Sequence, residues 1–314
     1  MRKSLIFGMA FAFAGLATTG AQAADPAACR TVRMSNVGWS DNDAINGLAS
    51  YVLKAMGYKP KETILSVPVT YQALKTKKID VFLDNWMPTM TANITPYVKA
   101  KTVDVVRADL THAKYTLAVP AYLYAQGLHS FQDIAKFRKQ LGNKIYGIEP
   151  GNDGNRLILG MIKKGQFGLK GFRLVESSEQ GMLAEVKRDV AQKKPIVFLG
   201  WAPHPMNTEF DMKYLSGGDK VFGGDSTVYS NVRAGYLQDC PNVGKFLKNL
   251  VFTLPMENTL MGQIMYKKAN AEAAAAKWLK ANPAVLKTWL AGVTTFDGKQ
   301  PALAAVDKSL GLGA

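Results

Sequence analysis

The sequence predicts an α/β fold made of two similar lobes with a cleft between them. Apolar segments typical of strands alternate with segments of helical periodicity, which indicates a sheet covered by helices. The second half also repeats a feature of the first, because a strand ending in DNWMP at 84–88 is echoed by one ending in LGWAP at 199–203. About 290 residues remain after a short leader, enough for two lobes with a core each.

In the first half, a strand, a polar loop and a helix form one unit, and a second unit follows. Apolar residues recur at helical spacing from Ile45 until Gly57 ends the helix. The predicted elements are a strand at 30–37, a polar loop at 38–43, the helix just described, a strand at 63–67, a helix at 71–77 and a short buried strand at 79–83. Loops at the carboxyl ends of such strands are the usual place for a ligand.

The second half restarts this pattern at about residue 114. Its predicted elements are a strand at 115–120 that crosses between the lobes, a strand at 144–148, a loop EPGNDGN at 149–155, a helix at 157–162 and an apolar strand leading into 199–203. A segment at 229–236 returns the chain to the first lobe, and the rest is mainly helical. We expect Trp278 and Trp289 to pack in the core of this helical part.

These elements predict a division of the chain into four parts. Residues 1–23 are a cleaved leader, 24–114 the first part of lobe 1, 115–225 lobe 2, and 226–314 the second part of lobe 1. We expect the lobes to open and close about the strands near Tyr115 and near residues 225–231.

The first residues have the pattern of a signal peptide. Met-Arg-Lys precedes a short apolar run at 5–16 and an Ala-Gln-Ala site at 21–23. The run is shorter than the ~20 residues that span a bilayer, so a membrane anchor is the weaker interpretation. Export through an oxidising compartment then favours a disulfide between Cys29 and Cys240 over two free thiols. The sequence therefore predicts a protein outside the cytoplasm in which a disulfide ties the start of the mature chain to its C-terminal third.

The formal net charge of +15 raises the question of nucleic-acid binding. Lys and Arg are scattered along the chain. The sequence lacks a run of basic residues interleaved with aromatic ones, which is the pattern that binds phosphates and bases. We therefore predict a basic solvated surface and no nucleic-acid partner. A protein this basic that binds a cation needs a local site rich in negative charge or aromatic rings.

Three tryptophans lie just past predicted strand ends, in loops where large aromatics are uncommon. Trp39, Trp86 and Trp201 occupy such places in the two halves. Each alone could cover the core of its own lobe, but together they predict a shared pocket in the cleft, where ligand sites are frequent. Rings that surround a quaternary ammonium attract it through their negative faces, by roughly 0.5 to 2 kcal/mol each.

Acidic and amide side chains accompany these tryptophans. Asp41 is close to Trp39, Asp84 and Asn85 precede Trp86, and Asn152 lies in the opposite loop. An ionised Asp accepts a hydrogen bond from a ligand hydroxyl and repels a ligand carboxylate, which favours choline over glycine betaine. Asp41 and Asn152 could instead be helix N-caps, since both precede predicted helices.

Four segments together resemble the periplasmic choline-binding proteins of ABC importers, within the glycine betaine/proline betaine binding family. They are VGWSD at 37–41, DNWMP at 84–88, EPGND at 149–153 and GWAPH at 200–204. The resemblance covers nearly the whole chain after the leader. It implies the two-lobed fold of type II periplasmic binding proteins, which close on a ligand about a hinge.

The resemblance also implies the ligand-binding residues. Trp39, Trp86, Tyr115 and Trp201 would surround the trimethylammonium group, with Asp41 and Asn152 at the hydroxyl end. It implies choline as ligand, a membrane permease with its ATPase as partner, a monomer, a periplasmic location and no cofactor or metal. Acetylcholine and betaines remain further candidate ligands, and this chain departs from many relatives at residues 42–43, which leaves open what contacts the hydroxyl.

Other functions find less support in the residues. The three histidines, His112, His129 and His204, lack metal-site spacing, and no G-x-S-x-G occurs, so we expect no enzyme. Hydrolysis of a choline ester stays open as an alternative. A glycine betaine or proline betaine binder of the same fold is the closer rival, because backbone N–H groups near 151–155 could hold a carboxylate.

Overall fold

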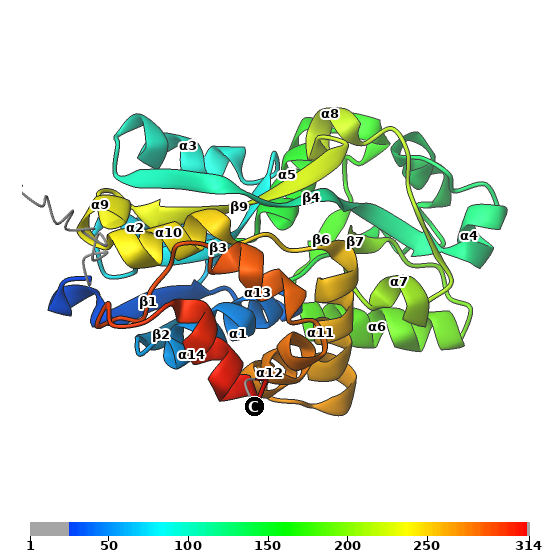
Figure 1. The fold of residues 1–314 in the computed structure, drawn as a ribbon. Coiled ribbons are helices and arrows are strands. Elements are labelled where there is room, and N and C mark those ends of the chain that lie inside the picture. The colour runs from blue at the N-terminus through cyan, green and yellow to red at the C-terminus, as the bar shows by residue number, and fades with distance from the viewer. Residues whose placement is uncertain (1–24, 313–314) are drawn as a thin grey trace, which may run out of the picture.

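The computed structural model describes residues 25–312 and consists of one curled sheet covered by helices (Figure 1). The strands are β1 (Thr31–Asn36), β2 (Lys59–Ile64), β3 (Val81–Met87), β4 (Val103–Pro120), β5 (Lys144–Tyr146), β6 (Arg173–Val175), β7 (Phe198–Ala202), β8 (Met212–Tyr214) and β9 (Asp225–Arg233). Their order is β2-β1-β3-β9-β4-β7-β5-β6, with β8 paired to β4. The predicted α/β fold with two lobes is confirmed.

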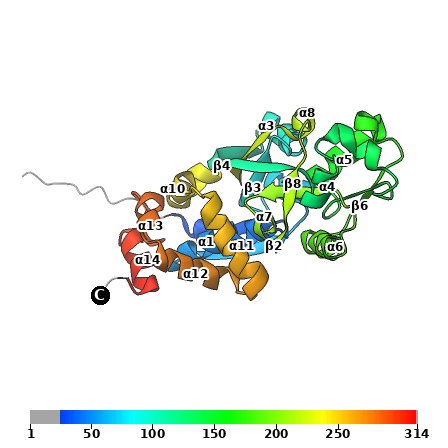
Figure 2. The ribbon, with the colours of Figure 1, turned by 90° about the vertical axis from the view of Figure 1, so that its right-hand side faces the viewer.

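Helices cover both ends of this sheet. They are α1 (Ser40–Ala55), α2 (Val67–Lys75), α3 (Thr91–Lys99), α4 (Ala121–Ala125), α5 (Asp153–Lys164), α6 (Glu179–Ala191), α7 (Met206–Glu209), α8 (Asp219–Phe222), α9 (Tyr236–Asp239), α10 (Pro241–Asn249), α11 (Leu254–Lys267), α12 (Ala271–Ala281), α13 (Ala284–Trp289) and α14 (Ala302–Leu310). Short 3-10 helices are η1 (Ala27–Arg30), η2 (Phe131–Phe137) and η3 (Gln166–Gly168). In the turned view, α5 and α6 lie at one end of the molecule and α10 and α12–α14 at the other (Figure 2).

Two long strands join the ends of the sheet. The strand β4 pairs antiparallel with β9 from Val103 to Lys114, and from Lys114 to Ala118 it pairs with β7 instead. The predicted crossing strand therefore exists, but it begins at Val103 rather than at 115. Its first part carries polar residues and three register shifts, so its sequence lacks the apolar alternation that marks a strand.

The C-terminal helices pack beside α1 and the first strands. Trp289 is fully buried, and its indole lies edge-on to Phe252 with ring centroids 5.9 Å apart. Trp278 is partly buried and packs against the same core, so Trp289 takes the predicted core position and Trp278 lies at its edge. The helix α12 packs against α1, and its buried residues are Ala274, Ala275 and Leu279.

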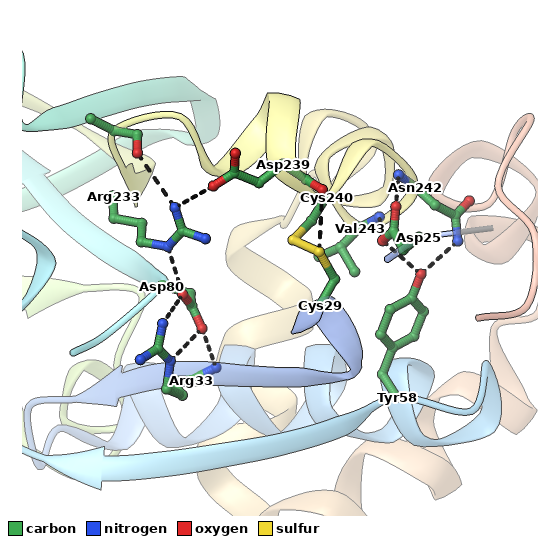
Figure 3. The surroundings of a disulfide bond; sticks show 11 residues. Asp25, Cys29, Arg33, Tyr58, Asp80, Arg233, Asp239, Cys240, Asn242 and Val243 are labelled. Carbon is green, nitrogen blue, oxygen red and sulfur yellow. Dashed lines mark hydrogen bonds and ion pairs between the residues drawn. A yellow bond between two sulfur atoms is a disulfide. The ribbon is translucent and has the colours of Figure 1, made fainter. Parts of the chain in front are cut away.

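A disulfide ties the start of the described chain to its last third. Cys29 and Cys240 are bonded, as predicted, across a separation of 211 residues (Figure 3). Beside it, the buried carboxylate of Asp25 accepts hydrogen bonds from the backbone N–H groups of Asn242 and Val243 and from the Tyr58 hydroxyl. The carboxylate thus satisfies free donors at the start of α10.

An ion-pair cluster around the buried Asp80 holds the same region together. Asp80 lies between Arg33 and Arg233, with contacts of 2.6 and 2.8 Å to the two guanidinium groups (Figure 3). Arg33 belongs to β1 and Arg233 to the end of β9, so the carboxylate just before β3 links three neighbouring strands.

Replacing Cys29 and Cys240 together by serine should lower the free energy of unfolding by about 2–4 kcal/mol. The bond closes a loop of 211 residues, so breaking it releases much conformational entropy in the unfolded chain. Chemical denaturation of the double variant and of the parent measures the loss. The parent treated with a reductant should show the same loss, and equal denaturation midpoints for oxidised and reduced parent would contradict the prediction.

Residues 1–24 and 313–314 lie outside the described residues, and the predicted signal peptide falls there. In residues 25–312, no helix combines the length and apolar character that crossing a membrane requires.

Candidate ligand-binding site

The repeated tryptophan loops have the same backbone form in both halves. Trp86 lies near the end of β3 and Trp201 near the end of β7. In each loop a cis peptide bond follows one residue later, at Met87–Pro88 and at Ala202–Pro203. The likeness visible in the sequence is therefore a likeness of structure.

Trp39 reaches the site from a different kind of loop. Gly38 has a φ of 84°, a conformation that side-chain-bearing residues rarely adopt, and it turns the chain between β1 and α1. Trp39 then precedes the first helical residue, Ser40. The sequence predicted a polar loop through residue 43, whereas α1 already begins at Ser40.

Tyr115 lies where β4 changes its partner. It faces Trp201 in the β4–β7 register, and the two rings are perpendicular with centroids 6.1 Å apart. Trp86 contacts the same tyrosine with centroids 5.9 Å apart. The crossing strand thus brings together aromatic rings from both ends of the sheet.

A small cavity lies among these rings. Its empty volume is about 240 Å³, and all four aromatic rings on its wall are at least 95% buried. Its lining residues are Trp39, Asp41, Trp86, Tyr115, Ile148 and Trp201. Five of the six predicted ligand-binding residues therefore line a single cavity.

Two residues differ from the sequence-based expectation. Asn152 does not line the cavity: it is the N-cap of α5, and its Oδ1 accepts hydrogen bonds from Asn155 N at 3.0 Å and from the Tyr115 hydroxyl at 3.1 Å. Asn152 therefore contacts the Tyr115 hydroxyl and positions this ring without lining the cavity itself. Ile148 lines the cavity although we did not predict it, and only its place at the end of a predicted strand could have pointed to it.

Asp41 is not the N-cap of its helix. It is the second residue of α1, and its Oδ1 accepts from Asn42 N at 3.0 Å. Asp41 is 2% exposed and lines the cavity. Burial, and next the nearby Glu179, raise the pKa of Asp41 to about 8. Its second oxygen is thus available on the wall of the cavity for a donor.

Two of the three cavity indoles donate their N–H to a carboxylate. Trp39 Nε1 donates to Glu149 at 2.8 Å, and Trp86 Nε1 donates to Asp84 at 2.7 Å. A carboxylate on the N–H edge polarises the indole, which makes the ring face more attractive to a cation. Sequence reasoning named Asp84 as a neighbour of Trp86 but could not assign it this bond, and it did not single out Glu149.

Buried carboxyl groups concentrate around the cavity of a protein that is basic as a whole. Burial raises the pKa of Glu149 to about 7 and of Asp153 to about 6. Burial, followed by Asp41, also raises the pKa of Asp84 well above its usual range. A positively charged ligand would offset the repulsion among these groups, whereas an anionic ligand would add to it.

These shifts predict that the ligand-free protein loses stability as pH rises from about 4 to about 8. Over that range the folded state keeps protons on Asp41, Glu149 and Asp153 that the unfolded chain has already released. Stability is therefore fully present below the unfolded pKa and is lost as pH rises through the folded values. Thermal melts of the parent and of Asp41→Asn test this.

The Asp41→Asn variant should melt with a flatter pH dependence, most clearly above about pH 6, because an amide does not titrate. A parent melting temperature that climbs steadily between about pH 5 and about pH 8 would contradict the prediction.

Comparison with known proteins identifies the family. Residues 30–281 match the substrate-binding domain of ABC-type glycine betaine transport systems, OpuAC. The chain belongs to this family. The expected resemblance is thereby confirmed, and the chain is a substrate-binding protein of the ABC transport type.

Two solved structures are especially similar to this family member. An ABC-transporter choline-binding protein in complex with choline is 56% identical and covers 91% of this chain and 100% of its own, with a TM-score of 0.89. A choline-binding protein in an unliganded semi-closed conformation has the same identity and coverage and a TM-score of 0.84. The arrangement seen here is thus closer to the liganded structure.

More distant relatives bind related ligands. Lactococcal OpuAC in its closed form with glycine betaine is 26% identical, covers 82% of this chain and 98% of its own, and has a TM-score of 0.76. The glycine betaine/carnitine transport binding protein GbuC of Listeria monocytogenes is 30% identical over 168 residues, which are 54% of this chain and 56% of that protein.

Proposed function

We propose that this protein captures choline in the cavity and delivers it to an ABC transporter permease driven by its ATPase. One observation carries the proposal: Trp39, Trp86, Tyr115 and Trp201 enclose a cavity that has the carboxylate of Asp41 on its wall. The ring faces suit a trimethylammonium group, which has no N–H to donate. The 56% identical relative whose structure contains choline supports this choice.

The polar part of the site favours a hydroxyl over a carboxylate. Asp41 accepts from a hydroxyl, and it would repel the carboxylate of glycine betaine. None of the cavity-lining residues in the described chain is Arg or Lys. The nearby Arg156 donates to the carbonyl of Thr89 at 2.7 Å instead. In this proposal Asn152 acts through Tyr115 rather than by contacting choline.

The proposed mechanism is closure of two lobes over the cation. Lobe 1 would comprise residues 24–114 and 226–314, and lobe 2 residues 115–225, with β4 and β9 bending near Tyr115 and residues 225–231. Closure removes water from the cavity, which strengthens the contact between the cation and the rings. The permease would then recognise the closed monomer in the periplasm, after removal of residues 1–23 as a signal peptide.

Isothermal titration of the ligand-free protein with choline, acetylcholine, glycine betaine and proline tests the proposal. We expect choline to bind most tightly and proline not to bind. Tighter binding of glycine betaine than of choline would make the protein an osmoprotectant carrier of the same fold. Incubation with acetylcholine, followed by NMR of the solution, checks that the ligand leaves chemically unchanged, as expected of a carrier and not of an esterase.

A further inference from the structure

Glu179 connects the two sides of the cleft although it does not line the cavity. It is the first residue of α6, and its side chain is completely buried. Its Oε2 accepts from Ser40 N at 2.9 Å and its Oε1 from Ser40 Oγ at 2.7 Å. Ser40 begins α1, on the opposite side of the cleft and 139 residues away in sequence.

This contact acts as a helix cap supplied from a distance. The residue in the N-cap position of α1 is Trp39, whose side chain makes no capping hydrogen bond. The first N–H group of a 16-residue helix would therefore lack a partner in its own segment. The Glu179 carboxylate fills that role, at the positive end of the helix dipole. It holds the residue that lies between Trp39 and Asp41, both on the cavity wall.

The same carboxylate reaches a second cavity residue through His204. His204 Nδ1 accepts from Met206 N at 2.9 Å, so the proton of the neutral ring is on Nε2, which donates to Glu179 Oε1 at 3.1 Å. The His204 ring contacts Trp201 with centroids 4.9 Å apart. One buried carboxylate therefore positions the start of α1 and, through a histidine, the Trp201 ring.

We propose that Glu179 is the positioning residue that couples ligand capture to closure of the cleft, by capping α1 from the opposite lobe and orienting Trp201 through His204. This rests on the proposed function for the identity of the ligand. When the lobes separate, Ser40 N loses its acceptor and Glu179 faces water. When they close, the two bonds to Ser40 form only if Trp39, Asp41 and Trp201 are in their places around the cation.

Replacement of Glu179 by glutamine tests this with little change in shape. The glutamine oxygen still accepts from Ser40 N, but its NH₂ group faces the N–H of His204, which cannot change tautomer while Nδ1 accepts from Met206 N. The amide NH₂ group and the His204 Nε2–H are both donors, so the hydrogen bond between residues 179 and 204 is lost. We expect the dissociation constant for choline to rise about tenfold to a hundredfold, mainly through faster dissociation.

Thermal melts separate a positioning role from a merely structural one. The ligand-free protein would exchange between a closed form and an open form in which Glu179 is solvated, so Glu179→Gln should leave the ligand-free melting temperature close to that of the parent and reduce the increase caused by choline. The matched control is Glu185→Gln, the same change on the same helix, where the carboxylate pairs with the exposed Arg188. A lower ligand-free melting temperature with unchanged choline affinity would overturn the proposal.

A readout without ligand keeps this inference distinct from the proposed function. Spin labels on Val69→Cys and Leu159→Cys, both exposed and on α2 and α5, report the distance between the lobes. Glu179→Gln should shift the ligand-free distances toward the open form, and Glu185→Gln should not. If the parent does not bind choline, the proposed function fails while this measurement still decides the role of Glu179. Identical distances for parent and Glu179→Gln, with equal ligand affinity, would refute it.

Discussion

Choline affinity should fall at least about 30-fold when Trp201 is replaced by alanine. The ring is 96% buried on the cavity wall, and a desolvated contact between a cation and an indole contributes about 2 kcal/mol or more. Each 1.4 kcal/mol changes a dissociation constant tenfold. Trp201 also packs against Tyr115 and His204, so its loss loosens neighbours on both sides of the cavity. Isothermal titration measures the change.

Trp278→Ala is the matched control for this prediction. Trp278 lies on α12, is partly buried and does not line the cavity. Its removal should leave the choline dissociation constant within about twofold of the parent's, a change well under the contribution of one ring. Equal affinities for the parent and Trp201→Ala would mean that the cavity enclosed by the rings is not where choline binds.

Replacing Asp41 by asparagine should reverse the preference between choline and glycine betaine or bring the two affinities close together. Above about pH 8, where Asp41 is ionised, a charged acceptor for the choline hydroxyl contributes about 1.5–3 kcal/mol, so choline binding should weaken about tenfold to a hundredfold. Glycine betaine should gain, because the repelling carboxylate is gone and the asparagine amide can donate to the ligand carboxylate. The ratio of the two dissociation constants in parent and variant is the quantity to measure.

Asp43→Asn makes the same chemical change two residues further along α1. Asp43 accepts from Asn36 Nδ2 at 2.7 Å and does not line the cavity. The ratio of choline to glycine betaine affinity should therefore stay as in the parent. A variant at Asp41 that weakens both ligands equally would show that this carboxylate shapes the site without selecting the ligand.

Much of the site could be predicted because its signals are local. Each tryptophan loop carries its own pattern of strand, tryptophan and proline, and its recurrence in both halves is visible without coordinates. The fold class followed from strand and helix periodicity, and the pairing of Cys29 with Cys240 followed from there being only two cysteines in an exported chain. Short sequence segments therefore indicate most of the aromatic residues that line the cavity.

The tertiary structure alone decided what each polar residue near the rings does. Asn152 caps α5 and holds Tyr115, and α1 can begin at Ser40 with Glu179 as a partner 139 residues away. No local pattern reveals such partners, because a hydrogen bond depends on which side chains the fold brings within about 3 Å. The raised pKa of Asp41 has the same origin, since burial and a neighbouring carboxylate exist only once the chain has folded.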